Sequence, residues 1–156
     1  MDRCSRVAPA DKVQTEPRGK KIYFSMISGI ILTHGDLCFG LKDTLQGIMG
    51  AQEGLAVISN SGMGREELVS ALQRKVNEEA NPDGVIIFVD MFGTSCWQTA
   101  KRAVAAMQES KKELALISGV NLPMLVKFFS ERESLPISQL VPLLQQEGEK
   151  GIRTEG

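Results

Sequence analysis

One histidine dominates the chemistry that this sequence could perform. His34 is the only histidine among the 156 residues, and it directly follows the apolar run of residues 27–33. A second apolar run, residues 85–91, contains Asp90 near its end, and Ser95 follows it. An imidazole, a carboxylate and a hydroxyl are side chains that nucleophilic and general acid–base catalysis use. They can act together only if the fold brings residue 34 next to residues 90–95.

Several other chemistries have less support. One histidine and two separated carboxylates do not form a ligand cluster, so we expect no metal site. Ser95 does not lie in a GxSxG motif, which disfavours a serine hydrolase. Cys38 and Cys96 lie close to these residues in the sequence and are conceivable nucleophiles, although such cysteines usually pack as small apolar residues. The chain has no GxxxxGK[ST] and no complete GxGxxG, so we expect no bound nucleotide and no cofactor.

A histidine that attacks phosphorus fits these residues best. Imidazole is largely neutral near pH 7 and is a good nucleophile. A carboxylate on one ring nitrogen fixes the tautomer and leaves the other nitrogen free to attack. Backbone N–H groups at helix N-termini bind phosphoryl oxygens without any further charge. The segments in which we expect such phosphate-binding groups contain Gly35, Asp36, Phe92, Gly93 and Thr94.

Apolar runs alternate with amphipathic segments along the chain, and this alternation predicts the elements that position these residues. Strands are expected over residues 27–33, 55–59, 85–91 and 114–120. A helix is expected after each strand, with a last short helix over about residues 138–146. The residues predicted to face inward are Leu37, Leu41, Leu45 and Ile48 in the first helix; Leu68, Val69, Leu72 and Val76 in the second; Trp97, Ala100, Val104 and Met107 in the third; and Met124, Leu125, Phe128 and Phe129 in the fourth.

This order of elements predicts a three-layer α/β fold, in which helices flank a mainly parallel four-stranded sheet. Open parallel sheets place their sites at the carboxyl ends of the strands. Polar residues follow three of the predicted strands, namely His34, Asp90 and the segment 119–123. Taken singly, each also fits a structural role, such as a helix cap for Asp90. Taken together, they lead us to expect that all three strand ends share one small region.

Length, charge and cysteine usage limit the class of protein. A chain of 156 residues makes one domain, and its net charge of -1 offers no electrostatic basis for nucleic-acid binding or for an anionic membrane surface. The apolar runs are far shorter than the roughly 18 residues that cross a bilayer, so no direct membrane insertion is expected. Three cysteines without CxxC spacing suit a reducing compartment, and we expect a cytoplasmic protein.

Residues 1–25 differ in character from the rest of the chain. They hold six basic and three acidic residues, and they have few apolar residues. We expect a disordered extension over residues 1–25 and one folded domain over residues 26–156. The extension is either native or the remnant of a vector or of an over-long gene prediction, in which case Met26 is the true start.

Three segments resemble the mannose-type enzyme IIA proteins of the bacterial sugar phosphotransferase system. Residues 31–37 (ILTHGDL) resemble the family's phosphorylation segment, residues 89–95 (VDMFGTS) its second block and residues 117–125 (ISGVNLPML) its third. The order and spacing match from about Met26 to the C-terminus. The resemblance implies the same α/β fold and a homodimer that exchanges a C-terminal strand, for which residues 151–154 are the expected segment.

The resemblance also implies a function. In this family the phosphocarrier HPr phosphorylates a histidine of IIA, and IIA passes the phosphoryl group to IIB for sugar uptake. By resemblance, His34 is the phosphoryl carrier, Asp90 contacts its ring and Ser95 lies near the phosphate, with no metal or cofactor. Thr94 and Cys96 depart from the Gly and Pro that are common in the family.

Two alternatives to a sugar-transport role remain. One is a regulatory module of IIA type, whose phosphorylation controls a partner protein. The retained set of His34, Asp90 and Ser95 favours the phosphocarrier, because a binding module needs no nucleophile. The other is the related phosphotransfer subunit of the dihydroxyacetone kinase system, which the sequence His34-Gly35-Asp36 suits less well.

Overall fold

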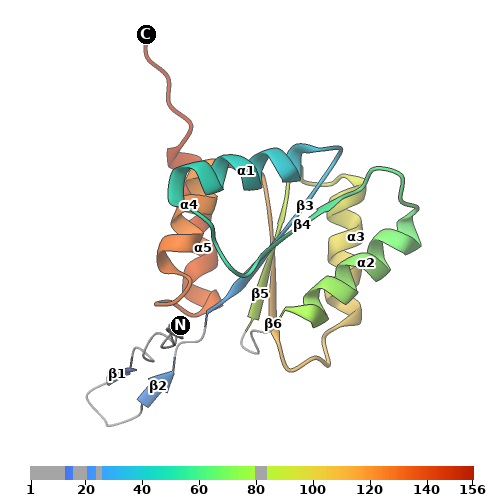
Figure 1. Cartoon of the computed structure of the whole chain (residues 1–156), viewed down its shortest axis with the longest axis horizontal. Coiled ribbons are helices and arrows are strands. Elements are labelled where there is room, and N and C mark those ends of the chain that lie inside the picture. The colour runs from blue at the N-terminus through green and yellow to red at the C-terminus, as the bar shows by residue number, and fades with distance from the viewer. Residues whose placement is uncertain (1–12, 16–20, 24–25, 80–83) are drawn as a thin grey trace, which may run out of the picture.

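The structure is a computed structural model that describes residues 13–15, 21–23, 26–79 and 84–156. Its main part is a four-stranded parallel sheet with helices on both faces (Figure 1). This confirms the predicted α/β fold and its three layers. The strands lie in the order β4-β3-β5-β6 and comprise β3 (Ser28–Thr33), β4 (Leu55–Ser59), β5 (Gly84–Val89) and β6 (Glu113–Ser118).

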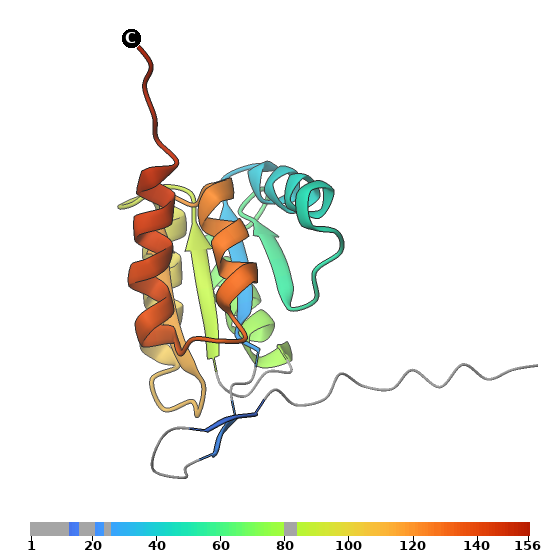
Figure 2. The same ribbon diagram turned by 90° about the vertical axis from the view of Figure 1, so that its left-hand side faces the viewer.

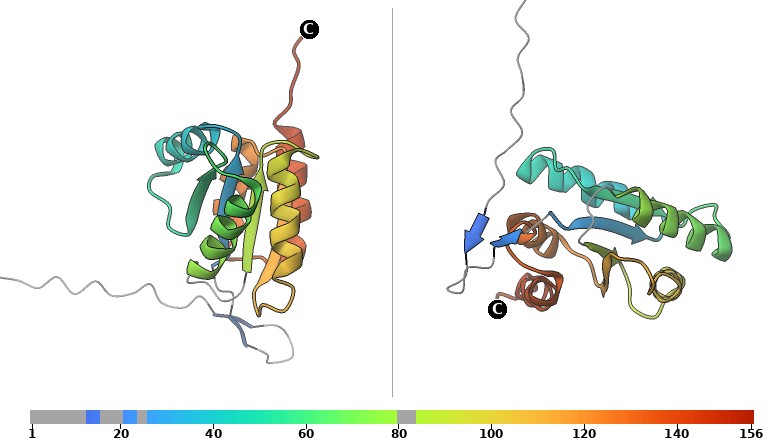
Figure 3. Two further views of the ribbon diagram at one scale, coloured as in Figure 1. Left: turned by 90° about the vertical axis from the view of Figure 1, so that its right-hand side faces the viewer. Right: turned by 90° about the horizontal axis from the view of Figure 1, so that it is seen from below.

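Five helices cover the sheet. Figure 2 shows α1, α4 and α5 in front of one face, and Figure 3 (left) shows α2 and α3 in front of the other. Each face of the sheet packs on its own apolar cluster, so the core is split into two parts by the strands. The helices are α1 (Leu37–Met49), α2 (Arg65–Glu78), α3 (Ser95–Ala106), α4 (Leu122–Glu131) and α5 (Ile137–Lys150).

Two strands end earlier than the apolar runs predict. β5 ends at Val89 and β6 at Ser118, two residues before the expected ends of both strands. The side chain of Asp90 accepts the backbone N–H of Met91 (2.9 Å), so this N–H does not hydrogen-bond to a neighbouring strand. Gly119 has a φ of 74°, a left-handed conformation that ends the extended backbone. Asp90 is therefore a loop residue at the carboxyl edge of the sheet.

The buried faces of α2 and α4 are those predicted, whereas the predicted faces of α1 and α3 are partly wrong. In α1 Leu45 is buried, but Leu37 and Ile48 are exposed and Cys38 takes the inward position. Cys38 donates its N–H to Thr33 Oγ1 (2.8 Å), and this bond sets the rotation of the first turn. In α3 the buried set is Cys96, Thr99, Ala100 and Ala103, while Trp97, Val104 and Met107 are only half-buried.

Helix α5 is longer than the predicted segment 138–146, because Gly148 does not end it. Gly148 is buried, and a Cβ there would lie 2.8 Å from Met124 Cε and 3.3 Å from Asn121 Nδ2. The glycine thus permits a close contact between α5 and the start of α4, and the helix continues to Lys150.

The two ends of the chain are where we predicted a disordered extension and an exchanged strand. Within the segment expected to be disordered, β1 (Val13–Thr15) and β2 (Lys21–Tyr23) form an antiparallel pair. The rest of residues 1–25 lies outside the described residues, as do residues 81–83, where the sequence Asn-Pro-Asp-Gly predicts a turn. Residues 151–156 form no strand in this single chain and extend away from the helices (Figure 2), so strand exchange stays a prediction.

Within the described ranges, no helix is long and apolar enough to cross a membrane.

Candidate functional site

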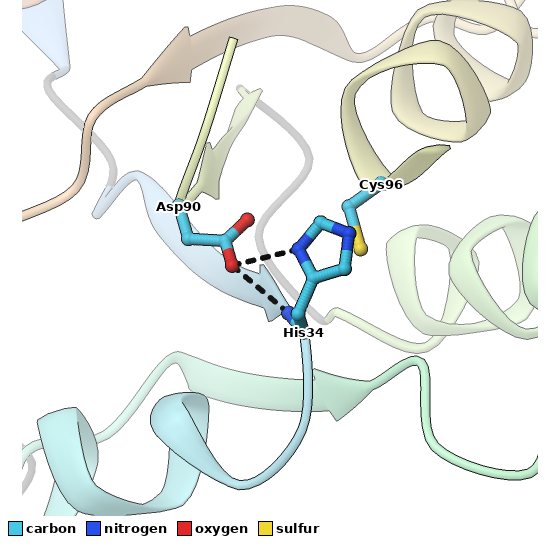
Figure 4. Close-up of side chains that lie close together, drawn as sticks. All are labelled: His34, Asp90 and Cys96. Carbon is cyan, nitrogen blue, oxygen red and sulfur yellow. Dashed lines mark hydrogen bonds and ion pairs between the residues drawn. The ribbon is translucent and has the colours of Figure 1, made fainter. Parts of the chain in front are cut away.

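The strand order decides which polar residues meet. β3 lies between β4 and β5, so the loop after β3 can contact the ends of these two strands. His34 follows β3 and Asp90 follows β5. The ring Nδ1 of His34 lies 2.8 Å from Oδ2 of Asp90, and the His34 backbone N–H donates to the same oxygen at 3.0 Å (Figure 4).

The ionisation state of Asp90 determines which nitrogen of the His34 ring carries the proton. Burial raises the pKa of Asp90, but the hydrogen bonds from the backbone and ring of His34 and from the Met91 N–H outweigh burial and hold its pKa below the ordinary value. Asp90 is therefore a carboxylate at neutral pH and can only accept hydrogen bonds. Nδ1 of the neutral ring must then carry the proton, which leaves the lone pair on Nε2. The His34 side chain is 42% exposed, so Nε2 is accessible to another molecule.

Ser95 and the start of α3 face the free ring nitrogen. Ser95 Oγ lies 3.3 Å from Nε2 of His34, within reach of a hydrogen bond. The first hydrogen bond of α3 runs from the Gln98 N–H to the Thr94 carbonyl (2.9 Å). In the described part of the chain, the N–H groups of Ser95, Cys96 and Trp97 consequently have no backbone acceptor. These donors and the helix dipole favour an anion at this end of α3.

Binding of phosphate by the segment after His34 stays a prediction. The Gly35 N–H donates to Asn60 Oδ1 (3.1 Å). Asp36 precedes α1, and its backbone carbonyl accepts the N–H groups of Phe39 and Gly40. Of the predicted phosphate-binding residues, Phe92, Gly93 and Thr94 lie directly before the start of α3. The Thr94 hydroxyl is occupied, because it donates to the Met91 carbonyl at 2.8 Å.

The expectation that three predicted strand ends meet holds only in part for β6: the Val120 N–H donates to the Val89 carbonyl (3.1 Å), next to Asp90, but β6 does not neighbour β3. That strand is separated from β3 by β5, and two strand spacings amount to about 10 Å. Asn121, in the loop after β6, instead caps α4 by accepting the Met124 N–H (3.0 Å). Its amide also donates to the Gly148 carbonyl (3.1 Å), which ties α5 to the same loop.

Ser59, the last residue of β4, and Asn60, which follows it, are the residues that the sequence analysis missed. The Ser59 hydroxyl donates to the Gly35 carbonyl at 2.7 Å, and Asn60 accepts the Gly35 N–H. A polar pair directly after a buried strand was the available signal. Its meaning depended on knowing that β4 neighbours β3, which the sequence did not show.

Cys96 lies beside the ring, on the side away from Asp90 (Figure 4). Burial, with smaller contributions from Asp90 and Cys38, raises the pKa of Cys96 to about 11, so it is an unreactive thiol at neutral pH. Donor atoms of His34, Asp90 and Cys96 lie within 4.8 Å of one another. Both oxygens of Asp90 already accept hydrogen bonds, Oδ2 from His34 and Oδ1 from the Met91 N–H. A cation on Nε2 would therefore have Cys96 as its one remaining ligand in this group, whereas catalytic zinc sites use three protein ligands.

Exposed apolar side chains occur in the segments that follow β3, β4 and β5. Phe39 on α1 and Met63 after β4 line a groove of about 480 Å³ between α1 and α2. Met91 is exposed, and Phe92, which is 71% exposed, packs its ring against Trp97 at 4.9 Å between centroids. Apolar side chains gathered on a surface mark sites of protein interaction. The segments that follow these three strands therefore suit contact with another protein.

Comparison with known proteins decides the family. The profile described as "PTS system fructose IIA component" (EIIA-man) matches residues 28–144. The chain belongs to the EIIA-man family. It is thus a mannose-type IIA component of the sugar phosphotransferase system by family, and it spans 39% of the length of the mannose-specific EIIAB relative described next.

Individual relatives agree with this family. The mannose-specific EIIAB component of Escherichia coli strain K12 is 30% identical over 129 residues, which are 81% of this chain and 39% of that protein. The fructose-specific EIIA component of Bacillus subtilis strain 168 is 32% identical over 117 residues, 74% of this chain and 77% of that protein. The crystal structure of EIIA from Streptococcus agalactiae superimposes with a TM-score of 0.76 at 26% identity, covering 83% of this chain and 97% of that one.

Proposed function

We propose that this EIIA-man protein carries a phosphoryl group on Nε2 of His34, accepting it from phosphorylated HPr and passing it to IIB for sugar uptake. The observation that carries the proposal is the orientation of the ring. Asp90 holds Nδ1 at 2.8 Å, while Nε2 faces Ser95 and the start of α3. A neutral imidazole with one nitrogen fixed and the other free is arranged for attack through the free nitrogen.

The transfer is an exchange between two imidazoles. The Nε2 lone pair of His34 forms the new N–P bond, and the N–P bond of the donor phosphohistidine breaks with its electron pair returning to the donor ring. The ring of His34 gains positive charge as the bond forms. Asp90, kept ionised by its hydrogen bonds, stabilises that charge through Nδ1–H. Transfer to IIB reverses these steps toward a nucleophile on the partner.

The oxygens of the phosphoryl group are bound at α3. The free N–H groups of Ser95, Cys96 and Trp97 point along the helix dipole, and the Ser95 hydroxyl is 3.3 Å from Nε2. Binding by neutral donors suits a carrier, because it holds the phosphoryl group without adding a fixed positive charge that would oppose its release.

Labelling with purified components tests the proposal. The full chain is incubated with phosphoenolpyruvate, enzyme I and HPr, and intact-mass spectrometry measures the product. We expect one acid-labile phosphoryl group in the wild type and none in His34→Ala. A label on another residue, or full labelling of His34→Ala, would contradict the assignment.

A second step tests the destination of the phosphoryl group. The isolated phosphoprotein is mixed with the IIB domain of a mannose-type system, and the label is followed on both proteins. Transfer to IIB is expected for a transport component. A phosphoprotein that keeps its label in the presence of IIB would instead favour the regulatory module.

A further inference from the structure

The backbone around His34 is held from both neighbouring strands. On one side the His34 N–H donates to Asp90 Oδ2 at 3.0 Å. On the other side Ser59 and Asn60, at the end of β4, make three hydrogen bonds to this loop. The Asn60 N–H donates to the Thr33 carbonyl (3.1 Å), Asn60 Oδ1 accepts the Gly35 N–H (3.1 Å), and the Ser59 hydroxyl donates to the Gly35 carbonyl (2.7 Å).

These bonds act where the chain would otherwise be most free to rotate. Gly35 has a φ of 56°, and glycine crosses easily between left-handed and right-handed conformations. The peptide groups on its two sides are the ones that Asn60 and Ser59 hold. Rotation at Gly35 would turn the Cα–Cβ bond of His34 and move Nε2 away from the start of α3.

We infer that Asn60 and Ser59 are positioning residues for phosphoryl transfer. They keep the His34 backbone in the one orientation that allows Nδ1 to reach Asp90 while Nε2 faces α3. The inference rests on the proposed function, but the geometry that it invokes can be measured without any transfer. It gives the hydrogen bond between the Gly35 N–H and Asn60 Oδ1 a role in orienting the ring.

Asn60→Ala and Ser59→Ala test the inference, with Ser59→Thr as the conservative variant that keeps a hydroxyl. Ser61→Ala is the matched control, because Ser61 lies in the same loop and only its backbone N–H, which donates to Ser59 Oγ, takes part in a hydrogen bond among the described residues. Single-turnover transfer from phosphorylated HPr is measured at rising donor concentration. Two-dimensional ¹H–¹⁵N NMR reports the Gly35 amide and the ring nitrogens of His34.

We expect Asn60→Ala and Ser59→Ala to slow the transfer step about 10-fold to 100-fold, as when other groups that orient a histidine are lost. The donor concentration at half-maximal rate should stay unchanged, because a positioning residue acts on the transfer step and not on binding of the donor. Ser59→Thr and Ser61→Ala keep the wild-type rate. In Asn60→Ala the Gly35 amide proton shifts upfield, and the His34 ring nitrogens show a mixture of tautomers.

A fall in melting temperature without a change in rate would mean that both residues are merely structural, and would overturn the inference. The inference would also be overturned if Asn60→Ala and Ser59→Ala transferred at the wild-type rate and the resonances of the His34 ring nitrogens did not change. If the wild type accepts no label at all, the proposed function fails. The NMR comparison then still decides whether Asn60 and Ser59 orient the ring.

Discussion

Oδ2 of Asp90 accepts two hydrogen bonds from His34, one from Nδ1 at 2.8 Å and one from the backbone N–H at 3.0 Å. A single oxygen therefore fixes both the ring and the main chain of the proposed phosphoryl carrier. The Asp90 side chain is only 14% exposed, so water competes weakly for it. This pair of hydrogen bonds accounts for the tautomer of the His34 ring, for the free Nε2 and for the ionised state of Asp90.

Replacing Asp90 by Ala should slow phosphoryl transfer by about 10² to 10⁴, the range for losing an acid–base partner. The ring loses its fixed tautomer and the stabilisation of its positive charge. Single-turnover labelling by phosphorylated HPr measures the effect. Asp43→Ala, an exposed carboxylate on α1, is the control and should label at the wild-type rate. Wild-type labelling of Asp90→Ala would show that the ring needs no carboxylate.

Replacing Ser95 by Ala should slow phosphoryl transfer less than replacing Asp90 by Ala. One hydrogen bond to a charged phosphoryl oxygen is lost, worth about 1.5–3 kcal/mol, while the N–H groups of α3 remain. The transfer rate, measured by single-turnover labelling, should fall. The phosphohistidine should hydrolyse faster, which the decay of the labelled protein measures. A loss as large as that of Asp90→Ala would mean that Ser95 does more than bind an oxygen.

The stability contributed by Asp90 should depend on pH. Its pKa in the folded protein lies below the ordinary value, so its contribution is present above the pKa of the unfolded chain, near 3.8. That contribution is lost as the pH falls through the folded pKa. Urea unfolding of the wild type and of Asp90→Asn is measured at pH 7 and again near pH 3. The difference between the two proteins gives the contribution of the Asp90 carboxylate to the free energy of unfolding. The wild type should be the more stable at pH 7, and the difference should shrink in acid.

Arg132→Ala should destabilise the domain by about 2–4 kcal/mol, because a large side chain and its packing are removed. Arg132 is 4% exposed, its guanidinium donates to the Glu53 carbonyl (2.7 Å), and it lies 4.3 Å from the ring centroid of Phe129. Arg65→Ala, at an exposed position on α2, should change stability by less than about 0.5 kcal/mol. Denaturant unfolding followed by circular dichroism compares the two. Equal effects would show that the buried guanidinium adds nothing to stability.

Removal of residues 152–156 should weaken the predicted homodimer and leave the monomer folded. β6 is an edge strand, and unpaired edges invite strand addition. The tail after α5 is exposed, including Ile152, and would supply the exchanged strand to a second copy. Light scattering during gel filtration measures the mass of both forms at micromolar concentration. An intact chain that runs as a monomer would contradict strand exchange.

The sequence by itself determined the type of each main element. The four strands lie where the apolar runs predict them, with ends shifted by no more than two residues. The inward faces of α2 and α4 are as predicted. Periodicity and turn chemistry are local properties, so they can be read from neighbouring residues. His34, Asp90 and Ser95 could be singled out for the same reason, since each follows or lies near the end of an apolar run.

Only the tertiary structure decided which strand ends are neighbours. β3 has β4 and β5 beside it, so Ser59 and Asn60 reach the His34 loop while Asn121 does not. The rotation of α1 depends on the bond from Cys38 to Thr33, and the length of α5 depends on the contact of Gly148 with Met124. Strand order, helix rotation and close helix contacts all arise from packing between segments far apart in the chain. No local pattern records these contacts, and they hold the ring of His34 in its orientation.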